Sequence, residues 1–305
     1  MTVAIVGGSG FIGSHLIDQL LSADFEVTDF DIMPPPNLAA RHVYLDMLDP
    51  SKTVIALAGE YEALYMLAAM ANVGDVYRSP TQAVETNVLG TVNVLEAARR
   101  HDIPRFILAS TVWVYGTAPD HLCTEDSPLL AQKVDHVYTA TKIAAELLTY
   151  SYAKLYGIHY TVLRYGIPYG PRARSGTVMA EFVKRALNGK PMVIQGDGKQ
   201  KRRFVYVEDL AQANVLALSE KATNKTYNVD GPEEITVLEI AQSINDLLGP
   251  VQIQFEPARS GDYALHVAST ERIEQDLGWR PKTAFKDGLA KYVKWYQSRF
   301  VKPRV

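Results

Sequence analysis

The sequence of 305 residues lacks the features that mark several classes of protein. It contains one cysteine, Cys123, which excludes an internal disulfide framework and fits a reducing compartment. No stretch approaches the roughly 18 uninterrupted apolar residues of a membrane-spanning helix. The first residues, "MTVAIVGGSG", have neither the basic start nor the apolar run of a signal peptide. We therefore expect a cytoplasmic protein without a membrane partner.

The sequence also lacks an excess of positive charge. Its formal net charge is −3, which provides no basic footprint for binding nucleic acid. The basic cluster at residues 199–203 predicts a local anion-binding or solvated loop. His121, Cys123 and Glu125 alternate in an expected loop, but no fourth ligand at suitable spacing accompanies them. We therefore predict no metal site.

The first half of the chain alternates between short β-branched apolar runs and longer amphipathic segments. This pattern is typical of βαβ units in an α/β protein with a doubly wound parallel sheet. Strands are expected at residues 2–7, 26–31, 43–46, 63–69, 105–111 and 159–165, and helices at 11–25, 81–101 and 136–156. After Tyr165, glycine and proline punctuate shorter segments. We expect a larger domain at 1–165 and a smaller mixed α/β domain at 166–305, some segments of which return to the first.

A glycine motif lies between the first expected strand and the first expected helix. "VGGSGFIG" places Gly7, Gly10 and Gly13 where a tight turn and the helix N-terminus can approach a pyrophosphate. A glycine-rich turn without a ligand is the alternative. Asp31 ends the second strand 18 residues after Gly13, where a carboxylate can accept a hydrogen bond from a ribose 2′-hydroxyl. Residues 29–40 contain no lysine or arginine to pair with a 2′-phosphate, so this Rossmann-type site favours NAD over NADP, with Asp29 as a competing carboxylate.

The segment "HVYTATKIAAE" (136–146) holds a second motif. Tyr138 and Lys142 are four residues apart and share one face of the expected helix. An ammonium near a phenol stabilises the phenolate and lowers the phenol pKa. The alternative is an ordinary surface helix, because this spacing occurs often by chance.

Together these residues resemble the extended short-chain dehydrogenase/reductase family, and within it the nucleotide-sugar epimerases and dehydratases such as UDP-glucose 4-epimerase. The resemblance continues through "TNVLGTVNVLEAAR" (86–99), "STVWVYG" (110–116), "LRYGIPYGPR" (163–172), "GDGKQKRRFVYVEDLA" (196–211) and "RSGD" (259–262). It implies an NAD-binding domain followed by a substrate-binding domain. It also implies further cofactor-binding positions, which are Phe11, Ile12, Asp46, Met47, Leu67, Ala68, Ala69, Asn87, Tyr165 and Pro168.

The resemblance implies catalytic roles for three residues. Tyr138 would take the proton from a sugar hydroxyl while the carbon-bound hydrogen leaves as hydride to the nicotinamide. Lys142 would hold the cofactor ribose and keep Tyr138 acidic. Thr111 would hydrogen-bond the reacting oxygen, unless it is a strand-end threonine packed in the sheet. Asn87, in turn, could be a helix residue satisfied by backbone groups.

Substrate contacts are implied by the same resemblance. Arg202 aligns with an arginine that contacts the nucleotide diphosphate, and Arg259 and Asp262 match a family element. Guanidinium groups suit phosphates because they present paired donors in one plane. Three positions depart from the family pattern, namely Gly166, Ile167 and Arg203. Arg172 and Arg174 could restore phosphate contacts.

Two further departures bear on the reaction. The family's 4,6-dehydratases carry an Asp-Glu pair after the catalytic threonine, and its uronate decarboxylases usually keep the Glu; here Val112 and Trp113 occupy these positions. Neither transfers a proton. We therefore expect an NAD-dependent nucleotide-sugar 4-epimerase that acts through a 4-keto intermediate, with UDP-sugars as the first candidates. The alternatives are a dehydratase, a 4-keto-sugar reductase or a non-catalytic dinucleotide sensor. A homodimer through the helices at 81–101 and 136–156 is also expected.

Overall fold

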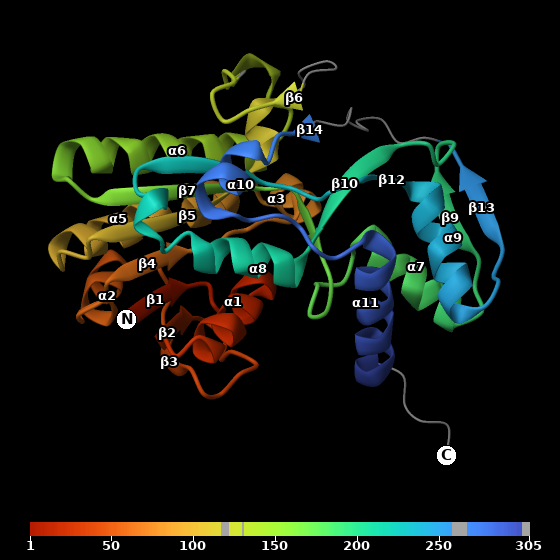
Figure 1. Cartoon of the computed structure of the whole chain (residues 1–305), viewed down its shortest axis with the longest axis horizontal. Coiled ribbons are helices and arrows are strands. Elements are labelled where there is room, and N and C mark those ends of the chain that lie inside the picture. Colours follow the sequence, from red (N-terminus) through yellow and green to blue (C-terminus); the bar gives the residue numbers. More distant parts are fainter. Residues whose placement is uncertain (117–121, 130, 258–266, 301–305) are drawn as a thin grey trace.

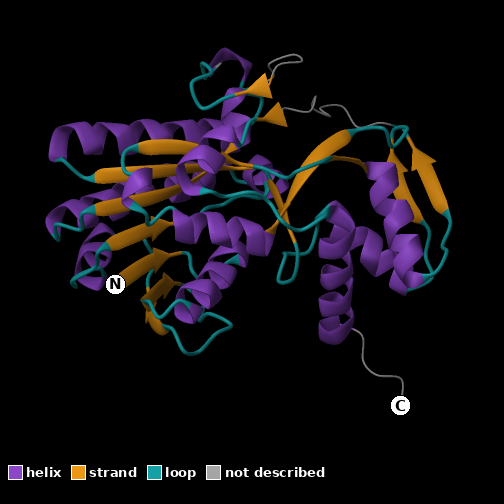
Figure 2. Ribbon diagram, in the orientation of Figure 1, coloured by secondary structure: helices purple, strands orange, loops and turns teal. Residues whose placement is uncertain are grey.

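The computed structural model describes residues 1–116, 122–129, 131–257 and 267–300. Its main element is a parallel seven-stranded sheet in the order β11-β7-β5-β4-β1-β2-β3 (Figures 1 and 2). The strands are β1 (Thr2–Val6), β2 (Glu26–Asp31), β3 (Arg41–Tyr44), β4 (Ala63–Met66), β5 (Arg105–Thr111), β7 (His159–Tyr165) and β11 (Lys225–Val229). β1 pairs with β2 on one side and with β4 on the other. The chain runs outward from β1 through β2 to β3 and then crosses back past β1 to β4, which is doubly wound topology. The predicted fold class is confirmed.

Apolar residues cover both faces of this sheet because successive side chains along each strand point into two different cores. Val3 and Ile5 pack with helices α1 (Phe11–Ser22), α8 (Val207–Leu216) and α10 (Glu271–Leu277). Ala4 and Val6 pack on the other face with α5 (Gly90–Arg100) and α6 (Val137–Tyr156). The rigid sheet therefore holds the carboxyl ends of its strands at one edge.

A smaller region lies beside the large sheet (Figure 1). It contains a three-stranded sheet, β12-β10-β8, and a two-stranded sheet, β13-β9, packed with three helices around a separate apolar core. Its elements are β8 (Ile167–Tyr169), α7 (Val178–Leu187), β9 (Met192–Gln195), β10 (Lys201–Tyr206), β12 (Glu234–Thr236), α9 (Val237–Leu248), β13 (Ile253–Glu256) and α11 (Phe285–Phe300). β8 follows β7 directly, so the chain enters this region at the carboxyl edge of the large sheet.

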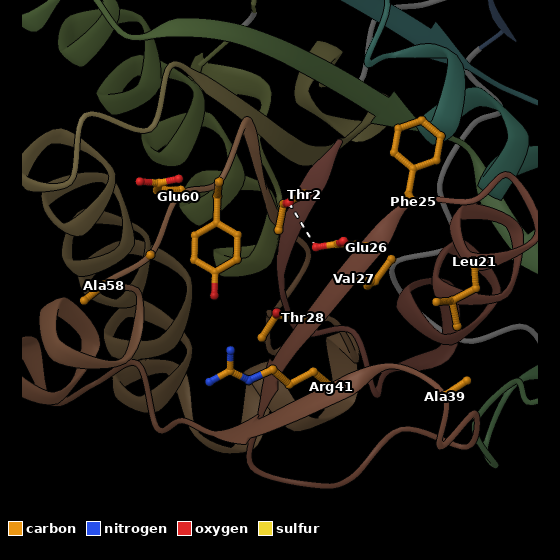
Figure 3. A pocket seen from close by; sticks show the side chains of 12 residues that line it. Thr2, Leu21, Phe25, Glu26, Val27, Thr28, Ala39, Arg41, Ala58 and Glu60 are labelled. Atoms are coloured by element: carbon orange, nitrogen blue, oxygen red, sulfur yellow. Dashed lines mark hydrogen bonds between the residues drawn. The ribbon is translucent and has the colours of Figure 1, made fainter.

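A surface hollow of about 480 Å³ lies at the opposite, amino edge of the sheet (Figure 3). Thr2 and Glu26, which begin β1 and β2, line it together with Phe25, Arg41 and Tyr61. The glycine turn follows the other end of β1, so this hollow takes no part in the site described below.

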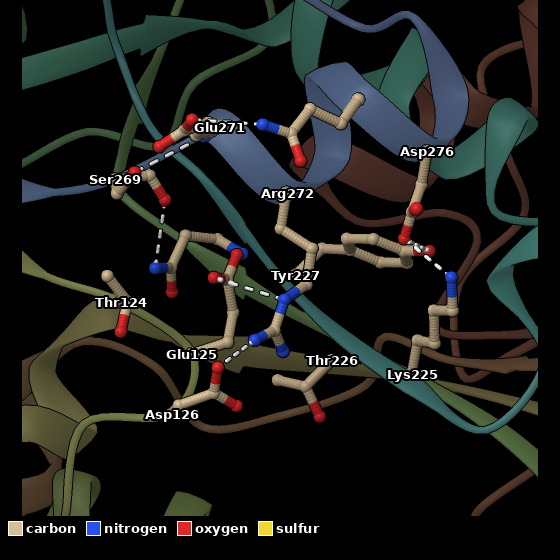
Figure 4. A network of polar contacts seen from close by, with 12 residues as sticks. Thr124, Glu125, Asp126, Lys225, Thr226, Tyr227, Ser269, Glu271, Arg272 and Asp276 are labelled. Atoms are coloured by element: carbon tan, nitrogen blue, oxygen red, sulfur yellow. Dashed lines mark hydrogen bonds and ion pairs between the residues drawn. The ribbon is translucent and has the colours of Figure 1, made fainter.

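Segments after residue 206 return to the large sheet. β11 pairs with β7 as an edge strand, and α10 is tied to it because Asp276 accepts hydrogen bonds from Lys225 Nζ at 2.7 Å and Tyr227 at 2.9 Å (Figure 4). Arg272 on the same helix pairs with Glu125 and Asp126. These contacts also hold β6 (Leu122–Cys123) and β14 (Val267–Ala268), which pair with each other near the site.

The expected elements match most of the observed ones, with the following differences. α1 ends at Ser22, before the expected 25, and α2 (Pro50–Ala56) and α3 (Val73–Arg78) were not expected. β3 begins and ends two residues before the expected 43–46, and β4 ends at Met66, before the expected 69. The expected helix at 81–101 comprises α4 (Pro80–Val84), a π-helical turn η1 (Glu85–Leu89) and α5. No helix in the described ranges combines the length and apolar character needed to cross a membrane.

Candidate active site

At Gly7 and Gly13 the glycine turn leaves no room for a side chain. Gly7 has φ +91°, which favours glycine, and a Cβ there would lie 2.4 Å from the Ala68 backbone nitrogen. A Cβ on Gly13 would lie 2.4 Å from the Gly7 carbonyl oxygen. Gly10 caps α1, so Phe11 and Ile12 occupy its first turn. A bare backbone turn at a helix N-terminus is the geometry that a dinucleotide pyrophosphate requires, so the turn fits NAD.

Two carboxylates from β2 lie beside this turn and differ in accessibility. Asp29 is fully buried; one oxygen accepts from Ser9 Oγ at 2.9 Å and lies 2.7 Å from His42 Nδ1. Asp31 is half-buried and accepts from the backbone N–H groups of Ser9 and Met33. Burial, followed by the nearby charge of Asp29, raises the pKa of Asp31. Asp31 is therefore the better placed of the two to receive a ribose hydroxyl.

The loop after β4 faces the glycine turn. The N–H groups of Leu67 and Ala68 both donate to the Val6 carbonyl, which turns the chain out of the sheet before Ala69. Met70, next along this loop, is held by Asn87 on η1: the Asn87 amide accepts from the Met70 N–H at 2.7 Å and donates to its carbonyl at 3.0 Å.

The Asn87 amide also donates to Thr141 Oγ1 at 3.0 Å. It is thus satisfied by backbone and by α6, as the alternative interpretation expected. Its position ties the loop after β4 to the helix that carries Tyr138 and Lys142.

The remaining predicted cofactor positions differ in what their side chains contact. Asp46 is exposed and accepts from the Leu48 N–H, whereas Met47 is buried in the core against Gly90. Tyr165 is buried and donates to Asn214 Oδ1 at 2.6 Å, so its phenol points into the core. Pro168 lies on β8, opposite Val205 of β10.

Thr111, Tyr138 and Lys142 come together at the carboxyl edge of the sheet. Thr111 ends β5, and its Oγ1 accepts a hydrogen bond from the Trp113 N–H at 3.3 Å. Lys142 is buried and donates from Nζ to the Ala109 carbonyl, two residues before Thr111, at 2.9 Å. Burial lowers the pKa of Lys142 to about 8, against the opposing charge of Glu146.

The expected acidification of Tyr138 by Lys142 is corrected by the structure. Burial raises the pKa of Tyr138 to about 12, because removing a phenolate from water is unfavourable. The lysine ammonium is held by the Ala109 carbonyl. The charge that favours the phenolate comes instead from Arg174, which donates to the Ala71 carbonyl at 3.1 Å on the loop after β4.

Arg172, the other arginine considered for phosphate contacts, is engaged elsewhere. It forms an ion pair with Asp18 of α1 at 2.7 Å. It therefore anchors the loop at 170–174 to the helix that follows the glycine turn. Arg174 thus remains the arginine of this pair that lies near Tyr138.

A buried carboxylate missed by the sequence interpretation lies one turn beyond Lys142. Glu146 pairs with Arg164 of β7, with Nη2 to Oε2 at 2.7 Å, and accepts from Ser110 Oγ at 2.5 Å. Glu146 is fully buried and Arg164 nearly so. Through Ser110, Glu146 and Arg164 this network joins β5, which carries Thr111, to α6, which carries Tyr138 and Lys142, and to β7. The i, i+4 spacing of Lys142 and Glu146 was its signal in the sequence.

The Gly166 and Arg203 departures have a structural explanation in Asp230. A Cβ on Gly166 would lie 2.0 Å from Asp230 Oδ1, so the carboxylate occupies the space that a side chain would need. Burial raises the pKa of Asp230 to about 6, and the charge of Arg203 opposes this shift. Asp230 therefore links the two departures: its carboxylate fills the space beside Gly166, and Arg203 provides an opposing charge.

The substrate and metal predictions fall partly outside the described residues. Arg202 lies on β10 and donates from Nη1 to the Lys201 carbonyl at 2.7 Å, whereas Arg259, Asp262 and His121 lie outside the described ranges. Glu125 accepts from the Asn228 N–H and pairs with Arg272. Within the described residues, no three His, Cys, Asp or Glu side chains gather as a metal site would require.

Comparison with known proteins identifies the family. A model of the NAD dependent epimerase/dehydratase family matches residues 3–230. The low-salt glycan biosynthesis protein Agl12 of Haloferax volcanii is 33% identical over 313 residues, covering 97% of this chain and 98% of the relative. A putative UDP-glucose 4-epimerase of Methanocaldococcus jannaschii is 30% identical over 306 residues, covering 97% and 98%.

The crystal structure of UDP-glucose 4-epimerase from Thermotoga maritima, determined with UDP-glucose, superposes with a TM-score of 0.90. The two chains are 29% identical, and the match covers 98% of this chain and 99% of the other. Both the match along the chain and the arrangement of the site agree with the predicted resemblance. The chain belongs to the NAD-dependent nucleotide-sugar epimerase/dehydratase family.

Proposed function

We propose that the protein is an NAD-dependent 4-epimerase of a nucleotide sugar, with UDP-sugars as its substrates. One observation carries this choice among the reactions of the family. Val112 is buried in an apolar cluster and the Trp113 ring packs against Tyr138, at the two positions where dehydratases of the family carry carboxylates. Tyr138 is thus the group placed to exchange a proton with the sugar, and 4-epimerisation needs no second carboxylate.

The residues of the chain divide the work of this reaction. Tyr138, as phenolate, takes the proton of the C4 hydroxyl and later returns it. Thr111 Oγ1 already accepts the Trp113 N–H, so its own O–H is available to donate to the reacting oxygen. NAD, held by the glycine turn and Lys142, would supply a hydride acceptor and donor for C4, and its positive charge would favour the Tyr138 phenolate.

Lys142 and the glycine turn position the cofactor in this proposal. The Lys142 ammonium lies within one helical turn of Tyr138, where it can donate to a ribose hydroxyl. Arg202, Arg259 and Asp262 are proposed to hold the nucleotide diphosphate. The substrate then lies between the carboxyl edge of the large sheet and the smaller region.

A panel of nucleotide sugars tests the proposal directly. The protein is incubated with NAD and UDP-, dTDP- and GDP-hexoses in D₂O, and the products are followed by NMR. A 4-epimerase forms the C4 epimer with no solvent deuterium on the ring. Deuterium at C5 or C6 with loss of water would identify a dehydratase, and the absence of any conversion would refute the proposal.

We also propose that the protein forms a homodimer through α4, α5 and α6. These helices pack together with η1, which joins α4 to α5. The four elements expose Val84, Leu89, Leu147 and Leu155, whose exposed fractions are 46%, 49%, 55% and 70%. Apolar side chains gathered on adjacent helices favour burial against a second copy.

A further inference from the structure

Trp113 and His136 form an aromatic wall beside Tyr138. The Trp113 and His136 rings lie with centroids 5.6 Å apart and planes inclined by 32°. The Trp113 ring also meets the Tyr138 ring nearly perpendicularly, with centroids 6.4 Å apart. A ligand whose hydroxyl reaches the Tyr138 oxygen must therefore lie close to this wall.

The local structure fixes Trp113 in place. It lies in the 3₁₀ turn η2 (Val112–Tyr115), which Thr111 caps through the Trp113 N–H. The other residues of the turn are buried, whereas Trp113 is half-buried. Its side chain packs on the apolar cluster of Val112 and Tyr115, and its ring also contacts the rings of His136 and Tyr138.

The wall presents little to satisfy a negative charge. Burial lowers the pKa of His136 from its ordinary value, against the opposing charge of Asp135, and so favours the neutral imidazole. The indole N–H of Trp113 is a single neutral donor, which suits a hydroxyl but leaves most acceptor sites of a carboxylate unsatisfied. The nearby Arg174 donates to the Ala71 carbonyl, and its charge favours the Tyr138 phenolate, which would compete with a substrate carboxylate for this cation. Placing an unpaired carboxylate against this wall would be unfavourable.

We propose that the wall of Trp113 and His136 selects a sugar whose substituent next to the reacting C4 is uncharged. This inference rests on the proposed 4-epimerase function. In hexoses and hexuronates alike C3 carries a hydroxyl, so the two classes differ in the group on C5, a hydroxymethyl or a carboxylate. The substrate class is therefore neutral hexoses, and hexuronates are rejected.

The test compares UDP-galactose with UDP-galacturonate, which share the nucleotide and the C4 configuration. We expect kcat/KM for UDP-galactose to exceed that for UDP-galacturonate by roughly 100-fold or more. Trp113→Ser opens the wall and should reduce this ratio at least tenfold. Trp113→Phe keeps an aromatic face and should preserve the ratio. Retained NAD binding shows that each variant is folded.

The outcomes separate the two proposals. Equal or faster turnover of UDP-galacturonate by the native protein would overturn the wall inference and leave the 4-epimerase standing. An unchanged ratio in folded Trp113→Ser would also overturn the inference. No conversion of any nucleotide sugar would overturn the 4-epimerase proposal and, with it, the inference.

Discussion

The cofactor side and the substrate side of the site are built differently. On the cofactor side, backbone groups and glycines set the shape: Gly7 and Gly13 exclude any side chain, and two N–H groups after β4 share the Val6 carbonyl. On the substrate side, individual side chains set the shape, above all Trp113 and Asp230. A surface made of backbone groups keeps its shape when the sequence varies, and so suits a cofactor that stays the same. A surface made of side chains changes its shape with single substitutions. The departures from the family pattern are concentrated on the substrate side, where we place the specificity.

The largest expected effect comes from substituting Tyr138, which lies where the cofactor side and the substrate side meet. Tyr138→Phe removes the phenol that exchanges the proton while keeping the ring against Trp113. We expect kcat to fall by about 10²–10⁴-fold with NAD binding retained, because general acid–base catalysis contributes about that much. Steady-state kinetics and calorimetric titration with NAD measure both quantities. Undiminished turnover would contradict the role of Tyr138.

The second-largest expected effect is on stability and comes from the buried ion pair of Glu146 and Arg164. Glu146→Gln leaves Arg164 buried without its counter-charge, and we expect a loss of about 3–5 kcal/mol in the free energy of unfolding. Glu96→Gln is the matched control. It removes the surface pairs with Arg99 and Arg100, and should cost less than about 1 kcal/mol. Urea denaturation measures both, and equal losses would show that burial of the Glu146 pair is unimportant.

Substitution of a glycine in the glycine turn should cause a selective loss of NAD affinity. A Cβ at Gly13 would meet the backbone of Gly7 and Gly8, so Gly13→Ala should raise the Kd for NAD by at least about tenfold. Gly157→Ala is the control, because Gly157 has φ +76° and an added Cβ there would meet nothing within 4 Å. It should cost about 1 kcal/mol of stability and leave the Kd unchanged. If both variants bind NAD normally, the turn is not the pyrophosphate site.

The cofactor side should also show a defined pH dependence. Lys142 has its pKa lowered to about 8, so it is charged below pH 8 and loses its proton as the pH rises through that value. The NAD affinity should therefore weaken by about tenfold above pH 8, because a charge-assisted hydrogen bond is lost. Asp31, whose pKa is raised, should weaken binding at the acidic end as it gains a proton. Calorimetry from about pH 4, near the ordinary pKa of an aspartate, to about pH 9.5 measures both limbs.

A charge-retaining substitution separates this titration from other causes. Lys142→Arg stays charged over the whole range. It should lose the alkaline limb and keep the acidic one. Persistence of the alkaline limb in this variant would assign it to another group.

The smallest effect concerns assembly. Leu147→Lys together with Leu155→Lys places charges on the exposed face of α6, and we expect the dimer to dissociate with little change in unfolding temperature. Light scattering after size-exclusion chromatography measures the mass. Lys substitution at Leu38, which is 84% exposed on the far β2–β3 connection, is the control and should leave the mass unchanged. A dimer that persists in the double variant would exclude this face.

Most of the fold could be predicted because periodicity and turn residues report local structure. The strands at 26–31, 105–111 and 159–165 were predicted with their observed bounds. The π-helical turn at Asn87 was missed, because one extra residue in a turn barely alters a helical pattern. The end of β3 was also missed: Leu45 still bonds Asp31 after the strand, so the apolar pattern outlasts the pairing.

The catalytic motif was visible in the sequence, whereas its surroundings were not. Interactions between distant segments, such as the charge of Arg174 acting on Tyr138 or the packing of Asp230 beside Gly166, leave no trace in the spacing of residues along the sequence. Burial, which raises the pKa of Tyr138 and lowers that of Lys142, is likewise a property of the folded chain. The structure therefore changed the electrostatic account of the site more than its list of residues.

The fate of the hydrogen on C4 tests the central claim most directly. UDP-galactose labelled with deuterium at C4 is incubated with the protein and NAD in ordinary water, and the product is analysed by NMR. We predict UDP-glucose with the deuterium retained at C4, because Tyr138 moves only the hydroxyl proton and the hydride returns to the carbon it left. Deuterium at C6 of a dehydrated product, or its loss to solvent, would contradict the account.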